Sequence, residues 1–142
     1  MRARICIVVA VGLLLAADAK DDAVKKELKK LEGTWKIEGF EHHGNRLNPE
    51  SWTLVIKGEK YTLTFGNTVE EGTFKIDPTK KPKTVEVTPS GGESEGKTRK
   101  GIYEVDGKSA KACFNVAGEK DRPSELATKA ENEHYLWELK RD

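Results

Sequence analysis

From Thr34 onward, apolar and polar residues alternate one by one in short runs that glycine and asparagine separate. A period of two is the spacing of side chains on one face of a β-strand. The pattern predicts eight strands, at Thr34–Glu41, Trp52–Lys57, Tyr61–Phe65, Glu71–Asp77, Thr84–Thr88, Arg99–Val105, Ser109–Ala117 and His134–Lys140. The shortest connections, such as Gly66-Asn67 and Asp106-Gly107, suit antiparallel hairpins because Gly and Asn tolerate a positive φ. We therefore expect consecutive strands to pair in up-and-down order.

The aromatic residues indicate which face of these strands is buried. Nine of the ten fall in phase with the aliphatic residues: Trp35, Trp52, Tyr61, Phe65, Phe74, Tyr103, Phe114, Tyr135 and Trp137. The alternate positions are mostly Lys, Glu and Thr. Eight antiparallel strands with one apolar face must close into a barrel or fold into a sandwich. Because closure removes the sheet edges, the expected fold is mostly β, an eight-stranded antiparallel up-and-down barrel.

A different period precedes the strands. Between Asp21 and Leu31, the apolar residues Val24, Leu28 and Leu31 recur at intervals of four and three, and lysines fill the other face. This spacing predicts a short amphipathic helix that packs across one end of the sheet and ends at Gly33. The alternative is a helix that lies on a membrane surface.

The first 19 residues have the features of a signal peptide. Arg2 and Arg4 precede an apolar run of 13 residues, Ile5 to Ala17, and Ala17-Asp18-Ala19 has the small-x-small pattern of a cleavage site. We therefore predict a signal peptide over residues 1–19, a mature domain over residues 20–142, and a secreted or periplasmic location. The alternative is an uncleaved anchor, although the run is shorter than the roughly 20 residues that cross a bilayer.

Charge and cysteine content narrow the range of partners. Cleavage removes two of the 25 basic and one of the 24 acidic residues, so the mature domain is formally neutral. A neutral domain lacks the general attraction on which nucleic-acid binding depends, although Lys80, Lys81 and Lys83 form a local basic cluster. We expect no nucleic-acid partner, and no membrane partner after cleavage. Cys113 is then the only cysteine, so no intramolecular disulfide forms.

The search for catalytic or metal-binding patterns is negative. The chain has no Gly-x-Ser-x-Gly motif and no glycine-rich phosphate loop. His42 and His43 are adjacent, so on a strand they would point to opposite faces, whereas a metal site needs converging ligands. The acidic residues Glu70, Glu71, Glu93 and Glu95 look like solvated charges. We therefore predict a protein that is not an enzyme, has no cofactor and no metal site, and is a monomer.

Several segments carry a resemblance to known barrels. Gly33-Thr34-Trp35 resembles the Gly-x-Trp opening of lipocalin and fatty-acid-binding barrels. The segments from Gly72 to Lys83 and from Gly101 to Gly107 resemble a lipocalin-like domain family of uncharacterised function that occurs in secreted planctomycete proteins. The resemblance covers about Leu28 to Arg141. It implies that Trp35 closes the base of the barrel and that Arg141 stacks on it as a structural latch, unless Arg141 is a frayed terminal residue.

Two functional hypotheses have support at this point, whereas a third, a hydrolase or inhibitor that acts outside the cell, has no residue evidence. The first is a protein that binds a small apolar or amphipathic ligand in the barrel, or an unknown protein partner at its mouth. Its interior contacts would be Trp52, Tyr61, Phe65, Phe74, Tyr103, Phe114 and Tyr135, with Arg46, Asn48, Lys120 and Arg122 at the rim. The second is a barrel that its own aromatic residues fill, which would serve as a structural or protein-interaction module without a small ligand.

Overall fold

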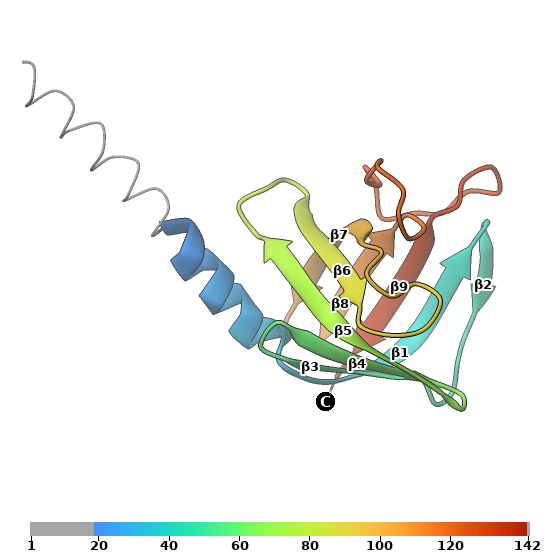
Figure 1. Cartoon of the computed structure of the whole chain (residues 1–142), viewed down its shortest axis with the longest axis horizontal. Helices are drawn as coiled ribbons and strands as arrows, with labels where there is room; N and C mark the ends of the chain where they lie inside the picture. Colours follow the sequence, from blue (N-terminus) through green and yellow to red (C-terminus); the bar gives the residue numbers. More distant parts are fainter. Residues whose placement is uncertain (1–18, 142) are drawn as a thin grey trace, which may run out of the picture.

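This computed structural model describes residues 19–141, which contain one helix and nine strands (Figure 1). The helix covers residues 19–31. The strands are β1 (Gly33–His42), β2 (Asn45–Leu47), β3 (Thr53–Lys57), β4 (Lys60–Phe65), β5 (Thr68–Asp77), β6 (Lys83–Pro89), β7 (Arg99–Asp106), β8 (Ser109–Phe114) and β9 (Tyr135–Lys140). The predicted signal segment lies almost wholly outside the described residues, which include only its last residue, Ala19. No helix within residues 19–141 is long and apolar enough to cross a membrane.

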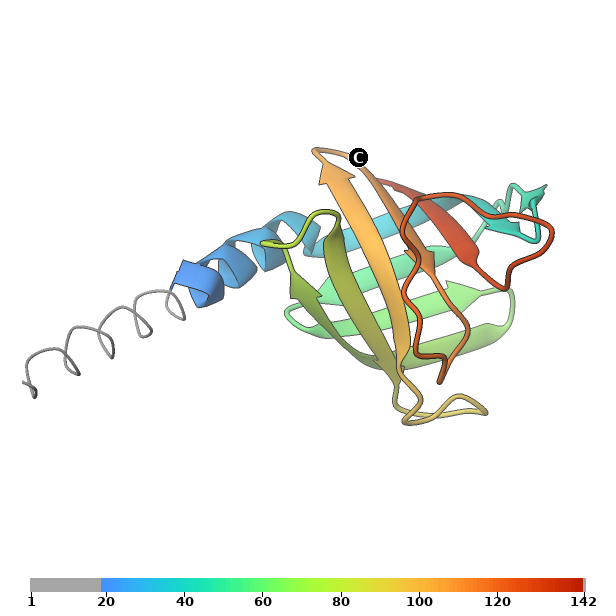
Figure 2. The ribbon, with the colours of Figure 1, turned by 90° about the horizontal axis from the view of Figure 1, so that it is seen from above.

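Eight of the strands close into an antiparallel barrel. Hydrogen bonding runs in the order β1-β3-β4-β5-β6-β7-β8-β9, and β9 pairs back onto β1 to complete the ring. The alternation of buried and exposed residues follows the predicted phase, for example Trp35 opposite Leu54 and Phe74 opposite Val87. Figure 2 shows the helix at one end of the barrel and the β1–β2 hairpin at the other. The predicted eight-stranded up-and-down barrel is confirmed.

The short strand β2 was not predicted, because the sequence favoured a loop from Glu41 to Ser51. It forms because a two-residue turn at His43 and Gly44 reverses the chain, so that His42 pairs with Asn45. Both turn residues have positive φ, 52° and 76°, as a type I′ hairpin turn requires. This turn also makes the expectation for the adjacent histidines wrong. Strict alternation of faces holds only for extended backbone, and the two imidazole centroids lie 3.9 Å apart on the same side.

Phe40 is the one aromatic residue that falls out of phase in the sequence. A register shift in the β1–β9 pairing between Ile37 and Gly39 moves it, because an extra residue in one strand exchanges the two faces beyond it. Phe40 therefore pairs with Trp137, and their ring centroids are 4.6 Å apart. The bulge brings this ring to the same side as the other aromatic residues of the barrel.

Two glycines make room for aromatic rings inside the barrel. Gly72 lies opposite Tyr61, and Gly101 lies opposite Phe114. A Cβ at Gly101 would come within 2.5 Å of a Phe114 ring carbon, and one at Gly72 would come within 2.8 Å of the Tyr61 ring. These contacts are shorter than van der Waals distance, so the rings occupy the space that a side chain would need.

A second, smaller core lies on the outer face of the barrel. Ile102, Cys113 and Leu136 are buried there, and Leu126 packs on them from the connection between β8 and β9. That connection begins after Phe114, so β8 is shorter than the predicted Ser109–Ala117 strand. The outer face of this part of the sheet is therefore apolar and covered, whereas the outward positions elsewhere are mostly polar.

The N-terminal helix packs on the barrel through the three apolar residues that the sequence predicts. Leu31 is buried in the main core, and Val24 and Leu28 pack against that core. The last helical residue is Leu31, as the apolar spacing predicts, and Gly33, with a φ of 129°, begins β1. The apolar stripe therefore holds the last turns of the helix against the barrel.

Candidate functional site

The barrel contains a half-open cavity of about 120 Å³. Its walls are almost entirely apolar, and they come from the helix end and from strands on all sides of the barrel. The lining includes Leu31, Ile37, Leu54, Ile56, Leu63, Val85, Val87, Ala110, Ala112, Trp137 and Leu139. An apolar cavity of about 150 Å³ in another protein accepts benzene, whereas drug-sized ligands occupy roughly 300–1,000 Å³. In this conformation, the cavity therefore suits only a compact molecule.

The seven predicted interior residues divide into two groups. Tyr61, Phe74, Tyr103 and Phe114 line the cavity. Trp52, Phe65 and Tyr135 lie instead toward the end of the barrel that is opposite the helix.

Those three residues form an aromatic cluster with Phe40 and Trp137. The ring centroids of Trp52 and Phe65 are 5.8 Å apart, and those of Phe40 and Tyr135 are 5.7 Å apart. Trp52 also lies 6.2 Å from Trp137. Such offset and tilted arrangements are favourable beyond the area that they bury. We call this group the aromatic cluster; its rings contact one another at the end of the barrel opposite the helix.

A polar group that the sequence analysis missed borders the cavity. Glu70 on β5 and Arg99 on β7 form a two-pronged ion pair, with Nη2–Oε1 and Nη1–Oε2 distances of 3.0 and 3.3 Å. The hydroxyl of Tyr61 donates to Glu70 Oε2 at 2.9 Å. The interpretation of Glu70 as a solvated charge was wrong, because the side chain of Glu70 is only 16% exposed. The clue was its phase, since Glu70 and Arg99 both fall on the inward positions of their strands.

The charges of Glu70 and Arg99 offset each other, and the phenol of Tyr61 remains neutral. Burial and the neighbouring Glu70 carboxylate raise the pKa of Tyr61 above its ordinary value, so the phenol stays protonated and donates. The positive charge of Arg99 compensates the negative charge of the Glu70 carboxylate. A charged ligand would have to break this ion pair, whereas an uncharged ligand with one polar atom would not.

A second buried polar group lies between the N-terminal helix and the barrel, and it consists of Glu27, Tyr103 and Lys83. Glu27 is 3% exposed, and its Oε2 accepts a hydrogen bond from the Tyr103 hydroxyl at 2.8 Å. Lys83 Nζ lies 2.7 Å from the same oxygen. Burial raises the pKa of Glu27, but the hydrogen bonds from Lys83 and Tyr103 outweigh burial, so the pKa lies below its ordinary value. This group joins the helix to β6 and β7.

Trp35 and Arg141 meet at the same end of the molecule. The guanidinium carbon of Arg141 lies 4.2 Å from the centroid of the Trp35 ring. Arg141 also donates to the carbonyls of Glu32 and Gly107 at 3.0 and 3.1 Å. Trp35 itself is fully buried, and its Nε1 donates to the carbonyl of Leu31 at 2.8 Å. The predicted stacking of Arg141 on Trp35 is therefore present, and neither residue belongs to the lining of the cavity.

Two of the residues expected at a rim are bound within the protein. Arg122 donates to the carbonyls of Val85 and Gly101 at 3.0 and 2.7 Å and to Glu86 at 3.0 Å. Arg46 pairs with Glu138 at 2.6 Å. Both guanidinium groups therefore hold chain segments together.

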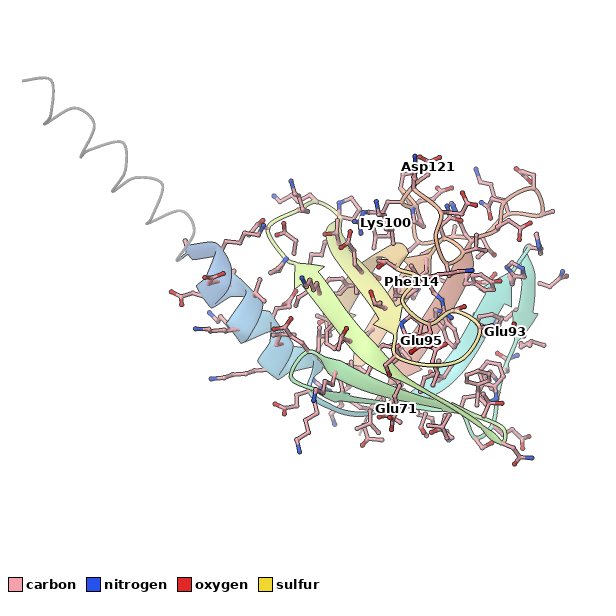
Figure 3. The ribbon with its side chains drawn as sticks, in the orientation of Figure 1. Glu71, Glu93, Glu95, Lys100, Phe114 and Asp121 are labelled. Atoms are coloured by element: carbon pink, nitrogen blue, oxygen red, sulfur yellow. The ribbon has the colours of Figure 1, made fainter. Side chains whose placement is uncertain are left out.

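Three of the acidic residues that the sequence analysis considered are exposed. Glu71 comes from β5, and Glu93 and Glu95 come from the loop after β6; all three are exposed (Figure 3). Burial raises the pKa of the Cys113 thiol to about 11, and its Sγ lies 3.7 Å from the carbonyl oxygen of Ala127. A thiol of this kind is a poor nucleophile at neutral pH.

The chain matches no family model, no curated protein and no solved structure. The fold and the geometry of the barrel interior are therefore the basis for assigning a function.

Proposed function

We propose that this chain is an exported, monomeric, lipocalin-like protein that binds a compact, uncharged apolar or amphipathic ligand inside its barrel and carries out no chemistry. The observation that carries the proposal is the apolar cavity of about 120 Å³ with the Tyr61–Glu70–Arg99 group at its border. Membership of the lipocalin-like family rests on the Gly33-Thr34-Trp35 opening and the two central segments of the sequence. Export rests on the signal-peptide features of residues 1–19.

The size of the cavity limits the class of ligand. A small aromatic molecule or a short aliphatic one fits a space of this volume. A long fatty acid or a retinoid would need the aromatic cluster to move aside. A hydroxyl or carbonyl on the ligand would find a hydrogen-bonding partner at Tyr61 or Arg99, while its apolar body would contact the aliphatic walls.

A thermal-shift titration tests this proposal. Toluene, phenol and benzyl alcohol are the probes, and benzoate and benzylamine are their charged counterparts. A ligand that binds only the folded state stabilises it by about 2.7 kcal/mol at a hundredfold excess over its Kd. We expect saturable shifts with the neutral probes and smaller ones with the charged probes, together with a change in tryptophan fluorescence as Trp137 contacts the ligand.

A pair of variants places the binding inside the barrel. Ala112→Leu adds volume at the cavity wall and should abolish the shift. Thr73→Leu adds the same side chain at an exposed position on the outer face of β5 and should leave the shift intact. If no probe shifts the melting temperature, or if both variants respond as the unmodified protein does, the binding proposal fails.

The aromatic cluster favours a second candidate function. Its five rings pack against one another at one end of the barrel. If these rings leave no room for a ligand, the domain is a structural or protein-interaction module with no small ligand. This function would be favoured if neither the small probes nor longer lipids changed the melting temperature of the protein.

A further inference from the structure

The β1–β2 turn and the segment just before β9 bring three metal-binding side chains together. Nε2 of His42 lies 3.9 Å from Oε2 of Glu133, and Nε2 of His43 lies 3.5 Å from the same oxygen. One ligand atom from each of the three side chains falls within 4.8 Å of the others. We propose that His42, His43 and Glu133 bind a divalent transition-metal ion of the Zn²⁺ class.

The hydrogen bonds of the two rings leave the right nitrogens free. Nδ1 of His42 lies 3.1 Å from the carbonyl oxygen of His134, and Nδ1 of His43 lies 3.2 Å from that of Ala130. A carbonyl only accepts, so each Nδ1 must carry the proton in these bonds. In a neutral imidazole the lone pair then lies on Nε2, the atom that faces Glu133. Metal-bound histidines commonly donate their other N–H to a carbonyl in this way.

The spacing of the donor atoms is close to what a metal needs. Zn²⁺ binds imidazole nitrogen and carboxylate oxygen at about 2.0–2.2 Å, which in tetrahedral geometry places neighbouring donors roughly 3.4 Å apart. The two separations from Glu133, 3.5 and 3.9 Å, are close to this value, and Glu133 can shorten them because its side chain is 61% exposed. The ligand atoms of the two histidines lie within 4.8 Å of each other.

The two imidazoles are held on a firm scaffold. His42 is opposite Tyr135 in the β1–β9 ladder, and the two rings stack with centroids 4.1 Å apart and planes 5° from parallel. His43 occupies the first position of a type I′ turn, where asparagine is the usual residue. The positive φ of His43 is what turns its ring toward that of His42.

The donor set selects the class of ion. Two imidazole nitrogens suit Zn²⁺, Ni²⁺ and Cu²⁺, whereas Mg²⁺ and Ca²⁺ prefer oxygen alone. Three protein donors leave at least one coordination position for water or an external anion. The bound ion would also link the β1–β2 hairpin to the connection before β9, next to the aromatic cluster.

The test is a Zn²⁺ titration of the full chain without an added histidine tag, by calorimetry and by competition with a chromogenic chelator. We expect one ion per chain and a higher melting temperature with Zn²⁺, but no response to Mg²⁺. His43→Asn keeps a residue that favours the turn and removes one donor, and Glu133→Gln removes another. Each should weaken Zn²⁺ binding by about tenfold or more without changing the melting temperature of the metal-free protein.

Two matched controls separate this site from general surface binding. Glu131→Gln removes the same charge from an exposed position on the same connection, and His134→Gln removes the remaining histidine; both should bind Zn²⁺ as the unmodified protein does. In ¹⁵N NMR spectra of the imidazole side chains, the Nε2 signals of His42 and His43 should shift when Zn²⁺ is added. Binding no tighter than millimolar, or equal binding by His43→Asn and Glu133→Gln, would overturn the proposal, as would loss of binding in either control.

Discussion

Replacing Glu27 tests whether the buried polar group at the helix end holds the helix to the barrel. In Glu27→Ala, the Tyr103 hydroxyl loses its acceptor while it remains buried, which costs about 1–3 kcal/mol. Lys83 also loses its partner, but its side chain is 35% exposed and regains water, so this part costs about 0–1 kcal/mol. We expect a total loss of about 2 kcal/mol in the free energy of unfolding.

For a domain of this length, that loss corresponds to a fall in Tm of roughly 6–12 °C. Thermal and urea unfolding followed by circular dichroism measure it. Asp22→Ala is the matched control, since it removes an exposed carboxylate from the same helix and should change Tm by very little.

A double-mutant cycle isolates the hydrogen bond. With Tyr103→Phe no hydroxyl is left unpaired, so Glu27→Ala should cost about 0.5–3 kcal/mol less in that background than in the unmodified protein. Additive losses, or a Glu27→Ala variant within about 0.5 kcal/mol of the unmodified protein, would refute this account of the helix contact.

The same residue predicts a pH dependence. Because the pKa of Glu27 is lowered in the folded protein from an ordinary value of 4.5, its carboxylate stabilises the fold above that ordinary value. This contribution is lost as the pH falls through the lowered folded-state pKa. The stability difference between the unmodified protein and Glu27→Gln should therefore be constant near neutral pH and shrink in acid. A difference that stays constant down to the most acidic pH at which the protein folds would contradict the assignment.

Three further changes follow from contacts described above. Arg141→Ala should lower the stability by about 0.5–2 kcal/mol, since it removes the cation over the indole ring; an unchanged Tm would count against a structural latch. Gly101→Ala should cost about 1–3 kcal/mol by overpacking, whereas Gly91→Ala, with open space around it, should be neutral in the same melting assay. Cys113 should react with a thiol reagent far more slowly in the native protein than in denaturant at about pH 8, and fast native labelling would contradict its burial.

The barrel was predictable because each strand has one buried and one exposed face, so apolar and polar residues alternate along its sequence. The same alternation identified the inward phase of Tyr61, Phe74 and Phe114. It failed at Phe40, because a bulge depends on the pairing of β1 with β9, which local sequence does not contain. The strand β2 was missed because Asn45, Arg46 and Leu47 are all exposed and show no alternation.

The polar groups were harder to predict than the fold. Glu27, Glu70 and Arg99 are separated along the chain from their partners, and their burial depends on pairings that appear only when the barrel closes. A charged residue at an inward position was the available clue for Glu70 and Arg99. For His42 and His43, the assumption of extended backbone misled the prediction, since the left-handed conformation of His43 brings the rings together.

Closure of the barrel by its first and last strands has a consequence for synthesis and folding. β1 ends at His42 and β9 begins at Tyr135, so the ring stays open until β9 has been synthesised. Such long-range pairing generally slows folding. For a chain that crosses a membrane before it folds, as the proposed export requires, this delay would keep the polypeptide unfolded until transport is complete.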